Sequence, residues 1–241
     1  MKYSSISRLG SREINEDSFL CTEQGSRVLC VVADGLGGHG HGEVASAIAA
    51  ETLNKVFKES ADLPLNELLD SAIIQAQNAI MAEQTKTSAY TEMKTTVVAV
   101  CTDGTDVCWG HVGDTRLYAF QNHSVKFRTL DHSIPQMLVL SGDIPERKIR
   151  NHPQRNLLLR VLGVEWDGPK HVISDLNKVS EYQAFLLCSD GFWELIDERH
   201  MCKLLKKSAS PEEWLQSMTA VVEKNGKKKD MDNYTAVALW I

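Results

Sequence analysis

The sequence contains no long apolar run, no C-x-x-C pair and no excess of positive charge, and each absence excludes a class of protein. A membrane-spanning helix needs roughly 18 consecutive apolar residues, so we expect no membrane segment. The formal net charge of −6 argues against nucleic acid as a partner, because binding to its phosphates depends on Lys and Arg.

The six cysteines lie mostly in apolar, strand-like segments, where they are expected to be reduced core thiols. The N-terminal residues also lack the apolar region of a secretory signal peptide. Both features predict a cytoplasmic protein. Nothing in the sequence suggests a coiled-coil seam, so we expect a monomer.

The 241 residues suit a single domain, 1–241, with a sizeable core. Apolar alternation and turn residues predict strands at 3–9, 17–22, 27–34, 97–101, 107–112, 117–120, 125–127, 172–176, 183–189 and 234–241. Helical periodicity predicts helices at 40–57 and 64–80, and helices that begin after Asp197 and Ser210. Residues 85–93 are predicted to be a polar connector. Because strands and helices come in blocks, the α+β class is favoured over a parallel α/β sheet.

Several acidic residues stand at the ends of apolar strands or beside glycines. Asp34 ends the apolar run 31–33, and four of the six residues after it are glycine. Asp190 and Asp114 repeat this arrangement, the latter more weakly. An apolar strand gains nothing by ending on a charge, so we expect these acids to converge on one site.

The acids of this pattern have no histidine or cysteine partners at metal-ligand spacing. They are Glu16, Asp17, Asp34, Asp114, Asp190 and Asp232. Oxygen ligands suit Mg²⁺ and Mn²⁺, and so many carboxylates in one cleft would need cations to offset their repulsion. Two ions roughly 3.5–4 Å apart could hold a bridging hydroxide as nucleophile. Arg12 could hold phosphate oxygens with its planar fork, so the residues predict hydrolysis of phosphate esters by direct attack of water.

The order of these motifs resembles that of the PP2C (PPM) family, the metal-dependent protein Ser/Thr phosphatases. The matching motifs are Arg12-x-x-Asn15-Glu16-Asp17, Asp34-Gly35-x-Gly37-Gly38-His39, Gly113-Asp114-Thr115-Arg116, Ser189-Asp190-Gly191 and Asp232-Asn233. Leu130-Asp131-His132-Ser133 and His152-Pro153 resemble its bacterial branch. The resemblance spans nearly the whole chain and implies an αββα sandwich, two mainly antiparallel sheets flanked by helices.

The resemblance also implies roles for the acids. Asp34 would bridge two Mn²⁺ or Mg²⁺ ions, and the Gly35 carbonyl, Asp190 and Asp232 would complete one site. Glu16 would serve the other ion, Asp17 would orient waters behind it, and Arg12 would bind phosphate. The catalytic set is therefore Asp34, Arg12 and Asp17. A third ion, known from bacterial members, would be held by Asp114, Asp190 and Glu194.

One position departs from the animal branch of the family, which carries a histidine after Asp-Gly that is thought to protonate the leaving group. Here the residue is Leu36. Our hypothesis is that a metal-bound water, or alternatively His39, supplies this proton.

The basic segment 141–162 coincides with the variable flap of the family, and we expect it to select phosphopeptides. The implied partners are phosphorylated proteins and a Ser/Thr kinase whose action the enzyme opposes. The compact length is also similar to that of phosphatases associated with bacterial type VI secretion, which oppose a partner kinase.

Two alternatives are weighed against this interpretation. Cys21 and Arg27 have the C-x₅-R spacing of cysteine-based phosphatases. That chemistry needs a helix N-terminus after the loop, whereas Arg27 leads into a strand-like run, so we reject it. The second alternative is a non-catalytic, phosphoprotein-binding or regulatory module. Such proteins usually lose a metal ligand, and this chain keeps every one that the resemblance names.

Overall fold

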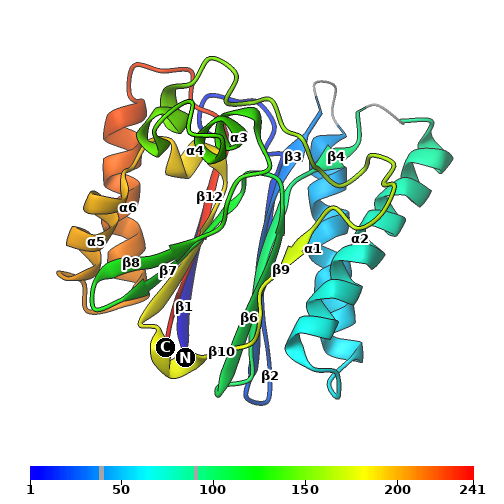
Figure 1. Cartoon of the computed structure of the whole chain (residues 1–241), viewed down its shortest axis with the longest axis horizontal. Coiled ribbons are helices and arrows are strands. Elements are labelled where there is room, and N and C mark those ends of the chain that lie inside the picture. The colour runs from blue at the N-terminus through cyan, green and yellow to red at the C-terminus, as the bar shows by residue number, and fades with distance from the viewer. Residues whose placement is uncertain (38–40, 90–91) are drawn as a thin grey trace.

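Two antiparallel β-sheets pack face to face, and helices cover both outer surfaces (Figure 1). The computed structural model describes residues 1–37, 41–89 and 92–241. The predicted α+β sandwich is confirmed.

The first sheet has the strand order β1-β12-β11-β7-β8. Its strands are β1 (Lys2–Arg8), β12 (Tyr234–Trp240), β11 (Ala184–Cys188), β7 (Arg116–Gln121) and β8 (Ser124–Arg128). Every pair is antiparallel. Because β1 and β11 both pair with β12, this sheet brings the two ends of the chain together with its middle.

The second sheet has the order β10-β6-β5-β3-β2. Its strands are β10 (Asn177–Lys178), β6 (Asp106–Val112), β5 (Val97–Thr102), β3 (Arg27–Leu36) and β2 (Asp17–Gln24), with β4 (Lys94–Thr95) beside β3 and β9 (Val172–Ile173) beside β6. The hairpin between β5 and β6 turns at Gly104 as its Asp-Gly pair predicts, with a φ of 93°.

Helices complete the outer layers. They are α1 (Gly42–Glu59), α2 (Leu65–Thr87), α3 (Ile134–Leu140), α4 (Asp190–Trp193), α5 (Glu198–Leu205) and α6 (Pro211–Gly226), with the 3₁₀ helices η1 (Glu146–Asn151) and η2 (Val179–Glu181). The predicted caps are confirmed: Asp197 accepts from the backbone N–H of His200 at 2.9 Å, and Ser210 accepts from that of Glu213 at 3.2 Å.

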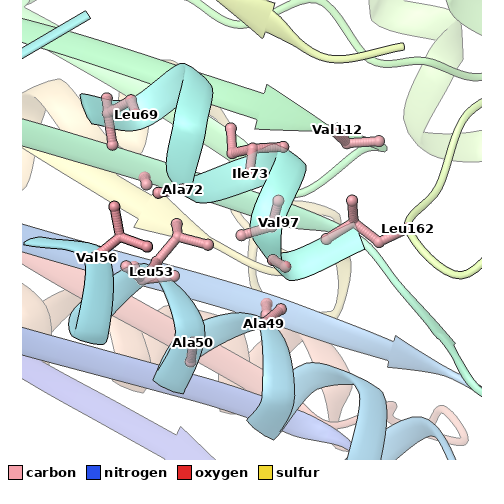
Figure 2. Close-up of a cluster of buried hydrophobic side chains, with 14 of the residues drawn as sticks. Ala49, Ala50, Leu53, Val56, Leu69, Ala72, Ile73, Val97, Val112 and Leu162 are labelled. Atoms are coloured by element: carbon pink, nitrogen blue, oxygen red, sulfur yellow. The ribbon is translucent and has the colours of Figure 1, made fainter. Parts of the chain in front are cut away.

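Strand β3 contributes side chains to two clusters of the apolar core, one between the sheets and one beneath the helices. Val28, Cys30 and Val32 face the other sheet, and Leu29, Val31 and Ala33 face the helices. A strand buried on both faces reads as a continuous apolar run because successive side chains alternate between them. Figure 2 shows the helical side, where Leu53 and Val56 of α1 face Ala72 and Leu69 of α2.

Two predicted boundaries are wrong. α2 continues to Thr87, three residues into the predicted connector, and is capped at Ser88 with a φ of 59°. Its last turn carries no apolar period because Gln84 is buried there, where it donates to the carbonyls of Met93 and Gly163, each at 2.7 Å. The predicted strand 172–176 contains only the two residues of β9. No helix among the described residues is long and apolar enough to span a membrane.

A buried ion pair joins β7 to the segment after β8. Arg116 is 1% exposed and donates to both oxygens of Asp131, at 2.8 and 2.6 Å. Its third hydrogen bond goes to the hydroxyl of Tyr118, and its guanidinium lies 3.4 Å from the ring centroid of Trp193.

We predict that Asp131→Ala lowers the free energy of unfolding by about 3–5 kcal/mol, because it leaves the Arg116 charge buried and uncompensated. The control is Lys126→Ala, which removes a pair with Glu181 at the surface and should barely move the urea midpoint. Equal midpoint shifts for the two variants would contradict this account.

Candidate active site

The hairpin of β2 and β3 gathers three of the predicted acids. Asp17 and Asp34 are directly opposite in the antiparallel register. The N–H of Gly35 donates to the carbonyl of Glu16 at 3.0 Å. Sheet pairing therefore places Glu16, Asp17 and the end of β3 at one rim of the sandwich.

The first sheet supplies two more acids at the same rim. Asp190 begins α4 just after β11, and Asp232 lies two residues before β12. The pairing continues past β11, where the N–H of Ser189 donates to the carbonyl of Thr235 at 3.0 Å. Adjacent antiparallel strands, one ending and one beginning here, bring these two carboxylates together.

Seven of the predicted residues line one cavity of about 240 Å³. They are Arg12, Glu16, Asp34, Gly35, Asp114, Asp190 and Asp232, and Leu36 also lines it. Glu194 instead lines a neighbouring cavity of about 350 Å³, where it pairs with Arg155 at 2.8 Å. The arrangement thus brings Asp114 and Asp190 to one cavity but leaves Glu194 outside it.

Asp17 lies behind the cavity. It is 8% exposed and accepts a hydrogen bond from the Ser189 hydroxyl at 2.8 Å, while that hydroxyl accepts from the N–H of Thr235 at 2.9 Å. Burial raises the pKa of Asp17 to about 6, against the lowering effect of Ser189. Ser189 therefore ties an acid of one sheet to a strand of the other.

Asn233 has a similar joining role. Its carbonyl oxygen accepts from the N–H of Glu16 at 2.9 Å, and its amide donates to the carbonyls of Leu9 and Ile14 at 2.9 and 3.0 Å. The sequence motifs include Ser189 and Asn233, but no function was predicted for either residue. Each stands directly beside a predicted metal ligand, Asp190 or Asp232, and this position could have indicated a role in the site.

Burial and mutual repulsion raise the pKa values of the clustered carboxyls. The pKa of Asp34 is well above its usual range, first through burial and then through Asp17 and Asp190. That of Asp190 rises to about 7 through burial and then Glu194 and Asp232. Burial, followed by Asp190, raises the pKa of Asp114 as well. Arg116 offsets part of this effect at Asp114.

This donor set fits divalent cations that prefer oxygen, namely Mg²⁺ and Mn²⁺. Among the residues that the structure describes, no three His, Cys, Asp or Glu side chains are positioned to hold an ion as they stand. One of the carboxylates, that of Asp232, is paired instead with the guanidinium of Arg12 at 2.9 Å.

The cavity floor is closely packed around two glycines. A Cβ on Gly35 would meet the carbonyl of Gly42, and it would lie 2.6 Å from that of Glu16. A Cβ on Gly42 would lie 2.5 Å from the Glu16 carboxylate. The N-terminal residue of α1 can approach the acids only because both positions lack a side chain. His39, the alternative proton donor, lies outside the described residues.

Residues 6–234 match the family model described as protein phosphatase 2C. The chain belongs to this family. It is 34% identical over 203 residues to the serine/threonine phosphatase stp of Listeria monocytogenes, covering 81% of this chain and 79% of the relative. The predicted PP2C-type Ser/Thr phosphatase of the bacterial branch is thereby confirmed.

Two solved structures extend the comparison. The catalytic domain of the phosphatase PstP, in complex with 2 manganese ions, superposes with a TM-score of 0.83 at 25% identity, covering 99% of this chain and 97% of that one. PppA, a regulatory component of type VI secretion in Pseudomonas aeruginosa, gives a TM-score of 0.79 at 25% identity, covering 99% and 96%.

The packing at Gly35 generates a prediction. Gly35→Ala should unfold at a markedly lower urea concentration than the parent, because a new methyl group collides with backbone atoms that cannot rotate away.

The matched control is Gly25→Ala, at a position with a φ of 63° and nothing within 4 Å of a new Cβ. It should cost only the backbone strain of about 1–2 kcal/mol. A Gly35→Ala midpoint no lower than that of Gly25→Ala would show that the cavity floor has room.

Proposed function

We propose that this phosphatase hydrolyses phosphoserine and phosphothreonine in proteins by direct attack of water on phosphorus, with two Mn²⁺ or Mg²⁺ ions as cofactors. The supporting observation is the convergence of carboxylates from both sheets on one cavity that also contains Arg12. Bound divalent cations would lower the pKa of the attacking water and neutralise the charge that builds up on the phosphoryl oxygens.

The chain's own residues divide the task of holding the ions. Asp34 lies centrally among the acids and is proposed to be shared by both ions. Asp190, Asp232 and the Gly35 carbonyl would complete the ligands of one ion, and Glu16 would serve the other. Asp17 is a positioning residue, since Ser189 holds it behind the cavity. If a third ion binds, Asp114 and Asp190 are its ligands, and Glu194 could join them only by leaving Arg155.

Arg12 is proposed to bind the phosphoryl group of the substrate. Its side chain is 52% exposed at the cavity rim, and its present partner is Asp232. A guanidinium can present two parallel N–H groups to phosphoryl oxygens. Transfer of Arg12 from Asp232 to the substrate would bind the phosphoryl group and release the carboxylate toward a cation in the same movement.

The proposed biological setting is the reversal of a bacterial Ser/Thr kinase. Segment 141–162, the predicted flap, contributes Arg150, Asn151, Arg155 and Asn156 to the cavity next to the acidic one, so a bound phosphoprotein would contact it. The likeness to PppA extends the proposal to control of type VI secretion. Deleting the gene should raise phosphorylation of that kinase's targets, and unchanged target phosphorylation would remove this setting.

We predict that the purified protein releases phosphate from a phosphothreonine peptide with Mn²⁺ and that EDTA abolishes this. Asp34→Asn should lower kcat/KM by more than about a hundredfold, because the loss of a metal ligand exceeds the 10–100-fold effect of outer groups. Asp62→Asn, an exposed position, is the control and should match the parent.

Two other outcomes would contradict the proposed function. A metal-loaded parent enzyme that binds several phosphopeptides but hydrolyses none would favour the non-catalytic binding module. Activity that survives both EDTA and Asp34→Asn would revive Cys21, although Cys21 lies on β2 and Arg27 begins β3, without a helix N-terminus between them.

A further inference from the structure

A further cavity, of about 530 Å³, lies between β8, η1 and the start of α5. Arginines dominate its lining, whereas carboxylates dominate the lining of the candidate active site. Five arginines line the further cavity, from three separate parts of the chain: Arg116, Arg128, Arg147, Arg150 and Arg199.

Three of these arginines are held rigidly. Arg116 is fully enclosed by its contacts with Asp131 and Trp193. Arg128, with 8% of its side chain exposed, pairs with Glu146 at 2.6 Å. Arg150 pairs with Glu198 at 2.9 Å and donates to two backbone carbonyls. Such fixed guanidinium groups lose little freedom when an anion binds.

The lining has a surplus of positive charge. Its carboxylates are three, and two of them, Glu146 and Glu198, already pair with arginines. The third, Asp197, caps α5 and pairs with the His200 ring at 2.9 Å. Arg147 and Arg199 make no ion pair within the described part of the chain. Five guanidinium groups thus face three carboxylates in the lining. A fourth carboxylate, that of Asp131, lies behind the lining, where it pairs with Arg116 and Arg128.

The basic cavity connects to the acidic one. Arg150 lines both the basic cavity and the middle cavity that contains Arg155 and Lys229. The middle cavity shares Arg12, Asp190 and Asp232 with the candidate active site. The lining of the middle cavity combines four cationic side chains with the carboxylates of Asp190, Glu194, Asp230 and Asp232. A single extended ligand that crosses it from the active-site carboxylates would pass Arg155 and then Arg150, which also lines the arginine cluster.

We propose that the arginine cavity binds a second phosphoryl group of the same phosphoprotein substrate, some residues away from the phosphoryl group that is hydrolysed. The inference rests on the proposed function, which supplies a phosphorylated protein chain at the acidic cavity. Planar guanidinium forks match phosphoryl oxygens bidentately, and Arg147 and Arg199, which make no ion pair within the described residues, would face the dianion. The preferred substrates would then be multiply phosphorylated segments.

The test is the affinity of non-hydrolysable peptides for the Mn²⁺-loaded protein, measured by fluorescence anisotropy. One peptide carries a single phosphonate in place of the phosphothreonine phosphate. A series carries a second phosphonate at successive positions on either side. We expect one spacing to bind at least about tenfold more tightly than the single phosphonate, as charge-assisted hydrogen bonds allow.

Arg199→Glu should remove this gain without harming the fold, because an acidic residue in the first turn of α5 is favourable to the helix dipole. Arg147→Glu tests the opposite wall. Lys207→Glu, an equal charge change at an exposed position outside the cavity, is the control and should keep the gain. Thermal unfolding of each variant checks that it folds.

Three results would overturn the inference: no spacing that improves affinity, a gain that survives both arginine variants, or a gain that Lys207→Glu removes equally. Failure of the proposed function gives a different result, since phosphopeptides would then not be hydrolysed, whether or not the single phosphonate binds. An affinity gain that depends on Arg199 would still support the arginine cavity in that case.

Discussion

The repulsion among carboxylates at one rim of the sandwich is the constraint on which the rest of the site depends. The pKa values of Asp34, Asp114 and Asp190 are each raised by burial and by neighbouring carboxylates. A fold that gathers these groups loses stability unless something holds them in place or neutralises them. Hydrogen bonds of the backbone and of Ser189 and Asn233 hold the acidic residues in place, and bound cations would neutralise their charge.

The two sheets divide this work because neither could build the site alone. The second sheet supplies Asp34 through the register of β2 and β3, and the first supplies Asp190 and Asp232 where β11 ends and β12 begins. Ser189 and Asn233 cross between them. A shift of one sheet against the other would strain those crossing hydrogen bonds, so packing of the sandwich and geometry of the acids are coupled.

The sequence predicted the elements well where apolar periodicity was strong and poorly where polar residues were buried. β3 and α1 followed from their apolar patterns, whereas the end of α2 did not, because Gln84 is buried by satisfied hydrogen bonds. The acids were predicted because a charge at the end of an apolar strand is conspicuous. That Glu194 would face Arg155 could not be predicted, since its rotamer depends on a segment distant in sequence.

The same reasoning explains why a chain with a net charge of −6 concentrates arginines beside its acidic cavity. A phosphoprotein presents a dianion, which carboxylates alone would repel. Cations in the cavity can offset that repulsion only at the reacting group, and Arg12 acts at its edge. In the proposed complex, the parts of the substrate beyond it would meet Arg155, Lys229 and Arg150, which line the next cavity together with carboxylates such as Glu194 and Asp230. Adjacent cavities of different charge would then allow one surface to bind metal ions and phosphate groups at once.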